Sequence, residues 1–160
     1  MMNELLCKRI YNPAEISDGY RILVDRLWPR GVKKEVAAID LWRKDIAPTS
    51  ELRNWFAHMP ERYDEFTTRY IQELNVNPAA KEFMSLCIEK LREGNITLLY
   101  AAKNEEYNHA IVLRQWLEAK MKGKEKLSVP IIGQRALHVR QFLKCSFTNS
   151  ISCTSSTVPR

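Results

Sequence analysis

An α/β fold is the class that this sequence predicts: a small, mostly parallel sheet of about four strands, covered by helices. Two short, continuously apolar segments carry the prediction, residues 22–24 and residues 96–101. Such segments are typical of strands that are buried on both faces of a parallel sheet. Segments with the apolar spacing of amphipathic helices lie between and after them. We therefore expect three layers in a Rossmann-like arrangement.

The first part of the chain predicts short elements. A strand at residues 5–11 is ended by Asn12 and Pro13, and a turn at residues 17–19 leads into the strand that contains residues 22–24. After Gly31 we expect a short helix at residues 33–38 and a short strand at residues 41–44.

Capping residues mark the helices that follow. Thr49 is the expected N-cap of one helix, Pro60 restarts a second, and Asn77 caps a third that ends at Gly94. A last helix is expected from about residue 105 to residue 121, with Asn104 as its N-cap.

The charge balance divides the chain. The 160 residues carry a formal net charge of +6. From Lys122 onward seven basic residues face one acidic residue, so residues 1–121 are balanced, with 18 basic and 18 acidic residues. We expect a single α/β domain at residues 1–122, followed by a basic, Ser/Thr-rich extension at residues 123–160 that is partly disordered. The basic excess therefore says little about a site in the domain.

Several classes of protein are disfavoured by what the sequence lacks. The four cysteines show neither CxxC nor metal-ligand spacing, which predicts reduced packing residues and a cytoplasmic location. Asn3 and Glu4 interrupt any leader-like apolar run, and no apolar stretch approaches the ~20 residues of a membrane span, so no membrane association is expected. The five glycines are too scattered for a dinucleotide or P-loop motif, and no cofactor is expected. No cysteine ends a central strand, which argues against a thiol phosphatase or a sulfurtransferase.

Charged loops follow both predicted central strands. Because the carboxyl ends of parallel strands meet at one edge of the sheet, where ligands bind in open α/β folds, these side chains should lie together. Two arginines beside a helix N-terminus suit a phosphate or a carboxylate. The alternative is an ion-paired turn that only closes the strand. The expected anion-binding residues are Arg9, Arg26, Arg30, Lys103, Asn104 and Asn108.

Two further residues have predicted catalytic roles. Asp25, flanked by Arg26 and Arg30, is expected to be ionised and to orient or attack a substrate. His109, in a first helical turn, is expected to be neutral and to move a proton, although a lone histidine on a helix is more often a packing or capping residue. Glu106 and His109 share a helix face and are weak metal candidates together with Asp25, but no metal site is predicted. His58 is interpreted as a helix-end residue.

Four separated motifs carry a family resemblance. They are GYRILVDRLWPRG (19–31), DLWRKDIAP (40–48), ELRNWF (51–56) and LLYAAKNEEYNHA (98–110). In this order they resemble the YeaO-like branch of the domain of unknown function 488, over roughly residues 5–120. The resemblance implies a small α/β protein of bacteria or archaea whose site is formed by the two charged loops, and a family whose activity is unsettled. A related branch has a cysteine, and then a Cys-His-Arg run, where this chain has Ala102 and then Asn108, His109 and Ala110, so thiol chemistry does not carry over.

Three functions are consistent with these observations. The first is an enzyme that acts on a small anionic substrate, which bears a phosphate or a carboxylate and includes nucleotide-like compounds, at the carboxyl ends of the strands. The second is a non-catalytic module that binds a ligand, or nucleic acid through its basic tail. The third is a scaffold whose charges hold loops together. The neutral balance of residues 1–121 favours a small-molecule site, and the sequence makes no prediction of the oligomeric state.

Overall fold

Four parallel strands form one sheet in the computed structural model, which describes residues 3–123. The strands are β1 (Leu5–Arg9), β2 (Tyr20–Leu23), β3 (Leu41–Trp42) and β4 (Ile96–Tyr100), in the order β1-β4-β2-β3. The two apolar segments are neighbours at the centre of the sheet, with Ile22 opposite Leu98 and Leu23 opposite Leu99. The predicted central parallel strands are therefore confirmed.

Both central strands divide their side chains between the two faces of the sheet. Ile22 and Leu98 enter the larger core, whereas Leu23 and Leu99 enter a smaller core that includes Trp28 on the other face. All four aliphatic side chains are fully buried. A continuous apolar run is the pattern that burial on both faces requires.

Within residues 3–123, five helices accompany the sheet. They are α1 (Lys34–Ala37), α2 (Ser50–Phe56), α3 (Tyr63–Val76), α4 (Pro78–Glu93) and α5 (His109–Lys122). Three single turns of 3-10 helix also occur, at Ile16–Asp18, Lys44–Ile46 and Pro60–Arg62. Two predicted caps are confirmed, because Thr49 Oγ1 accepts a hydrogen bond from the Leu52 N–H at 3.3 Å and Asn77 Oδ1 accepts one from the Ala79 N–H at 3.0 Å.

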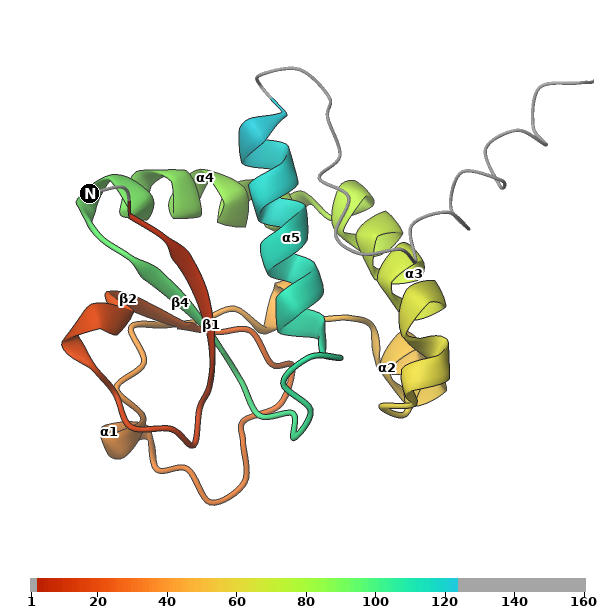
Figure 1. The fold of residues 1–160 in the computed structure, drawn as a ribbon, viewed down its shortest axis with the longest axis horizontal. Helices are drawn as coiled ribbons and strands as arrows, with labels where there is room; N and C mark the ends of the chain where they lie inside the picture. Colours follow the sequence, from red (N-terminus) through yellow and green to blue (C-terminus); the bar gives the residue numbers. More distant parts are fainter. Residues whose placement is uncertain (1–2, 124–160) are drawn as a thin grey trace, which may run out of the picture. The chain divides into compact units, whose positions relative to one another are not determined.

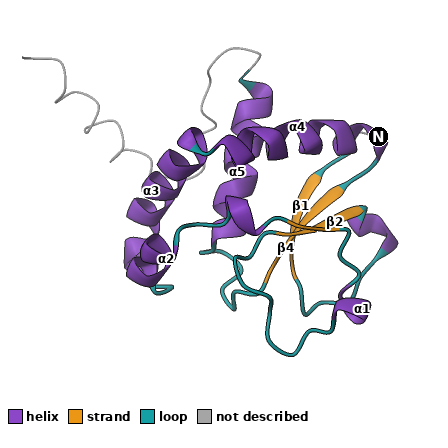
Figure 2. Cartoon of the chain, turned by 180° about the vertical axis from the view of Figure 1, so that it is seen from behind, coloured by secondary structure: helices purple, strands orange, loops and turns teal. Residues whose placement is uncertain are grey.

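The layers on the two faces of the sheet differ in kind. The residues of the larger core come mostly from α2, α3, α4 and α5, which lie on one side of the sheet (Figure 1). On the other side, the single-turn α1 and the loop after β2 supply the cover, as the purple and teal segments of Figure 2 show. The structure is thus a three-layer, Rossmann-like α/β arrangement, in which loops make up much of one outer layer.

Three predicted boundaries are wrong. Strand β1 ends at Arg9 rather than at residue 11. Helix α5 begins at His109 rather than near residue 105, and Asn108, not Asn104, is its N-cap. The Asn104 side chain instead accepts hydrogen bonds from the N–H groups of Glu106 and Tyr107, which closes a turn before the helix. The strand expected at residues 41–44 has only the two residues of β3, because a 3-10 turn begins at Lys44.

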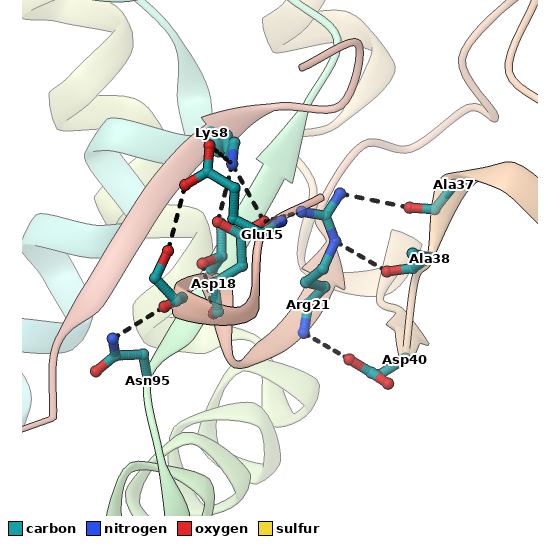
Figure 3. A network of polar contacts seen from close by, with 10 residues as sticks. Lys8, Glu15, Asp18, Arg21, Ala37, Ala38, Asp40 and Asn95 are labelled. Carbon is teal, nitrogen blue, oxygen red and sulfur yellow. Dashed lines mark hydrogen bonds and ion pairs between the residues drawn. The ribbon is translucent and has the colours of Figure 1, made fainter. Parts of the chain in front are cut away.

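A buried polar network lies between β1 and β2, away from the carboxyl edge of the sheet (Figure 3). Asp18 accepts hydrogen bonds from Lys8 Nζ at 3.0 and 3.2 Å, from the Glu15 N–H at 3.0 Å and from Arg21 Nη1. Asp18 and Arg21 are 3 % and 5 % exposed. Burial alone would raise the pKa of Asp18, but the hydrogen bonds from Glu15 and Lys8, together with the charge of Arg21, hold that pKa below its usual value.

The residue that follows this network must be glycine. Gly19 has a φ of +64°, and a Cβ there would come within 2.1 Å of the Asn95 carbonyl oxygen. The N–H of Tyr20 donates to that same oxygen at 2.8 Å, so the close approach is what aligns β2 with β4.

The predicted extension at residues 123–160 lies outside the described residues, apart from Gly123, and its separation from the domain stays a prediction. None of the helices within residues 3–123 combines the length and the apolar character needed to cross a bilayer.

Candidate functional site

A cleft of about 540 Å³ lies at the carboxyl edge of the two central strands. One wall is formed by the loops that follow β2 and β4, and the other by α2, the turn after it and α3. Arg30 from the first loop and His109 from α5 both line it. The two charged loops therefore share one edge, as parallel strands require.

Asp25 joins the three elements that meet at this edge. Its Oδ2 accepts a hydrogen bond from the Ala101 N–H at 2.8 Å, just after β4, and its Oδ1 lies 3.0 Å from His109 Nε2 at the start of α5. Its backbone carbonyl accepts a hydrogen bond from Trp42 Nε1 at 2.8 Å. Both oxygens of the carboxylate are thus engaged by the protein.

The contact between the Asp25 carboxylate and the His109 imidazole has an unusual geometry. The two side chains are only 13 % and 15 % exposed, and the distance suits an ion pair. The ring N–H is nevertheless not aligned for a hydrogen bond, and Nε2 is a buried atom with no hydrogen-bond partner within residues 3–123. The contact therefore places the imidazole beside the carboxylate, while Nε2 keeps the capacity to bond to another group.

The loop that carries Asp25 is rigidly held. Trp28 packs edge-on against Trp42, with ring centroids 5.4 Å apart, and donates its indole N–H to the Val32 carbonyl at 2.7 Å. Pro29 is buried, and Gly31 adopts a φ of +77° that closes the loop. The cleft wall is consequently preformed.

Six of the residues singled out in the sequence line the cleft, and three do not. Those that line it are Asp25, Arg26, Arg30, Lys103, Asn104 and His109. Arg9, Glu106 and Asn108 lie outside the lining. Arg9 donates from Nε to the Ala102 carbonyl at 3.1 Å, and its guanidinium lies over the Tyr11 ring. Asn108 uses its amide within the protein, since Oδ1 accepts from the Ile111 N–H at 3.1 Å and Nδ2 donates to two backbone carbonyls.

The charge around the cleft is mostly positive. Among the described residues that line it, four side chains are basic, Arg26, Arg30, Arg53 and Lys103, and one is a carboxylate, Asp25. Arg26 also donates from Nε to the Pro48 carbonyl at 3.2 Å, which joins the β2 loop to the segment before α2. An anion entering the cleft would meet a net positive field.

Sequence reasoning missed the second wall. Arg53 and Phe56 on α2, Phe66 on α3 and His58 all line the cleft. Of these residues, only His58 is interpreted from the sequence, as a helix-end residue. No local signal identifies them, because only the docking of α2 and α3 brings this wall to the carboxyl edge of the sheet.

The described cysteines lie away from the cleft lining. Burial raises the pKa of the Cys7 thiol to about 12, and the same effect raises the pKa of Cys87 to about 12. Cys7 Sγ is also 3.5 Å from the Ala110 carbonyl oxygen. Both thiols are free and behave as packing groups rather than as nucleophiles.

The metal candidates are not assembled into a site. Glu106 does not join Asp25 and His109 at the cleft, and no group of three His, Cys, Asp or Glu side chains within residues 3–123 has an arrangement that could hold a metal ion.

Together the fold and the cleft define a parallel α/β protein whose candidate site lies beyond the carboxyl ends of its central strands. The chain belongs to the DUF488 family: residues 4–132 match a family model described as the inactive DUF488-N3 subclade. The resemblance to the YeaO-like branch is confirmed by the similarity of the chain to YeaO itself.

Curated relatives match over nearly their whole length. The chain is 47% identical over 113 residues to the uncharacterized protein YeaO of Escherichia coli, which covers 71% of this chain and 96% of that protein. It is 39% identical over 112 residues to the uncharacterized protein Rv3073c of Mycobacterium tuberculosis, covering 70% of this chain and 92% of that protein. No solved structure matches the chain significantly.

Proposed function

We propose that this protein binds a small anionic ligand, bearing a phosphate or a carboxylate, in the cleft at the carboxyl edge of the sheet. The observation that carries the proposal is the excess of basic side chains: among the described residues, Arg26, Arg30, Arg53 and Lys103 line the cleft together with one carboxylate, Asp25. Arginine in particular suits planar oxyanions, to which it can donate two parallel hydrogen bonds.

The same geometry favours binding over catalysis. Asp25 has one oxygen bonded to the Ala101 N–H, and its other oxygen lies 3.0 Å from His109 Nε2, so the carboxylate is held in place by the protein itself. This chain has Ala102 at the position where a related branch of the family carries a cysteine. The description of the matching family model as inactive agrees with a role in which no bond is made or broken.

The experiment is a titration with ribose 5-phosphate, followed through the backbone amide signals by NMR. Signals of residues 25–31 and 101–104 should shift, and Arg30→Ala should weaken the affinity about tenfold, equivalent to about 1.4 kcal/mol. Lys81→Ala is the matched control, because it removes one exposed positive charge on α4, away from the cleft. The proposal fails if these amides do not respond, or if the two variants bind equally well.

A second candidate function is acid–base catalysis, and one observation favours it. The Asp25 carboxylate lies 3.0 Å from the His109 imidazole in the cleft wall, an arrangement in which a carboxylate can orient a histidine for proton transfer. Asp25→Asn separates the two functions. The binding protein should hold an anion as well or better after losing a negative charge, whereas an enzyme should lose turnover.

Nucleic-acid binding through the basic residues 123–160 involves a part of the chain outside the described residues, and it stays a prediction.

A further inference from the structure

The two walls of the cleft differ in chemistry. The loops after β2 and β4 contribute Arg30 and Lys103 to the lining, whereas α2, the turn after it and α3 contribute Phe56, His58 and Phe66. Phe56 and Phe66 are stacked, with ring centroids 4.3 Å apart and planes inclined by 21°. His58 meets Phe56 edge-on at 5.6 Å. The aromatic wall is therefore continuous from the core to the exposed imidazole.

The backbone that presents His58 is held in an unfavourable conformation. The consecutive residues Ala57 and His58 have φ values of +45° and +57°, in the left-handed region that residues other than glycine rarely adopt. The turn is closed by hydrogen bonds from the Ala57 N–H to the Arg53 carbonyl at 3.0 Å and from the Met59 N–H to the Phe56 carbonyl at 2.9 Å. Such strained positions persist where the surrounding structure enforces them, and they concentrate at binding sites.

The cleft is larger than a bare oxyanion such as phosphate requires. A volume of about 540 Å³ falls within the ~300–1,000 Å³ range of small-molecule sites. A phosphate held by Arg30 and Lys103 would leave the space beside Phe56 and His58 unfilled. Aromatic side chains next to such a space favour a planar ring, by stacking or by edge-to-face contact.

From this juxtaposition we propose that the ligand of the cleft is an aromatic anion. Its acidic group meets Arg30 and Lys103, and its planar ring packs on the exposed His58 imidazole, which lies edge-on against the buried Phe56 ring. The inference rests on the proposed function and adds the chemical class of the ligand to it. His58 is then a specificity-determining residue, which selects ligands that carry a ring.

The test compares probes that differ by one part. Adenosine 5′-monophosphate carries a ring and a phosphate, ribose 5-phosphate lacks the ring, adenosine lacks the phosphate, and phenyl phosphate replaces the nucleoside with a simple ring. We expect adenosine 5′-monophosphate or phenyl phosphate to bind at least tenfold more tightly than ribose 5-phosphate and adenosine. Which of these two binds more tightly distinguishes a nucleotide from a simpler aromatic acid as the source of the ring.

Two variants separate the contribution of the ligand's ring to the affinity from the contribution of its acidic group. His58→Asn should narrow the affinity ratio between the preferred ring-bearing phosphate and ribose 5-phosphate to less than about threefold, and asparagine is the chosen replacement because it tolerates a positive φ. Arg30→Ala should weaken both phosphates and preserve their ratio, and the Lys81→Ala control should alter neither the affinities nor the ratio. Phe56 is left intact because it is 2 % exposed and part of the core.

Two negative results have different meanings. If all the phosphates bind equally, or if His58→Asn leaves the ratio intact, the aromatic ligand is excluded while anion binding stands. If no probe perturbs the cleft, anion binding itself is refuted, and the inference falls with it.

Discussion

Replacement of Asp18 by alanine tests the buried network beneath the sheet. The carboxylate neutralises two cationic side chains at once, since Lys8 and Arg21 both donate to it and have side chains only 16 % and 6 % exposed. In the Asp18→Ala protein both charges would remain in a poorly solvated position without this partner (Figure 3).

The loss of unfolding free energy in Asp18→Ala depends on the hydrogen bonds and ion pairs that Arg21 and Lys8 retain. Removal of one member of a buried ion pair costs ~3–5 kcal/mol. Arg21 would still donate to the Ala38 carbonyl at 2.9 Å and to the Ala37 carbonyl at 3.4 Å, and Lys8 would still lie 3.3 Å from the Glu15 carboxylate. We therefore expect the lower end of the range, about 3 kcal/mol of unfolding free energy, or a melting temperature lower by about 10 °C.

The pH dependence has a definite sign. Because the folded protein holds the pKa of Asp18 below its usual value, the ionised carboxylate stabilises the fold at pH values above the unfolded pKa of about 3.9. That stabilisation is lost as the pH falls through the lower folded value. The difference between the parent protein and Asp18→Ala should be constant from about pH 7 to pH 5 and should shrink below about pH 4.

Urea unfolding, followed by tryptophan fluorescence, measures these differences directly. Glu15→Gln is the matched control, because the Glu15 carboxylate meets the same lysine but is 61 % exposed, and its loss should cost less than about 1 kcal/mol. The reasoning is refuted if Asp18→Ala costs no more than this control, or if its cost does not decline in acid.

Two further predictions concern the thiols and the start of α5. Burial raises the pKa of Cys7 and Cys87 to about 12, so iodoacetamide at mildly alkaline pH should leave both cysteines largely unmodified in the native protein. In guanidinium chloride it should modify both. Peptide mass mapping measures the modification, and rapid labelling of the native protein would contradict the prediction. Asn108→Ala removes the N-cap of α5, so it should cost about 1–2 kcal/mol and speed hydrogen exchange at the Ile111 amide, which loses its acceptor. Unchanged exchange at Ile111 would show that the cap contributes little.

Local sequence chemistry was enough to predict most of the elements. Thr49 and Asn77 are caps because each places a side-chain oxygen within reach of an N–H in its own first turn, an interaction that needs no other part of the chain. Helix α4 also ends where the sequence predicts, at Gly94. The start of α5 was misplaced because Asn104 and Asn108 are both capable of capping, and the sequence does not rank them.

Tertiary contacts resolve that ambiguity. Asn108 is 1 % exposed, and its amide donates to the carbonyls of Asn104 and Glu105, so the segment before α5 folds back on its own cap. Tyr107 meets Tyr63 of α3 with ring centroids 5.0 Å apart, which anchors the segment to a helix more than forty residues earlier. Such a contact is invisible to any local pattern.

The sequence by itself determined the sheet and one wall of the cleft. The apolar segments around Ile22 and Leu98 have no favourable place except between two covered faces, and parallel strands bring the loops after them to one edge, where Arg30 and His109 both line the cleft. Only the tertiary structure decided the other wall. The positions of Arg53 and His58 depend on how α2 and α3 pack across the sheet, and packing between distant segments is set by the shape of whole surfaces rather than by the residues next to one another in the chain.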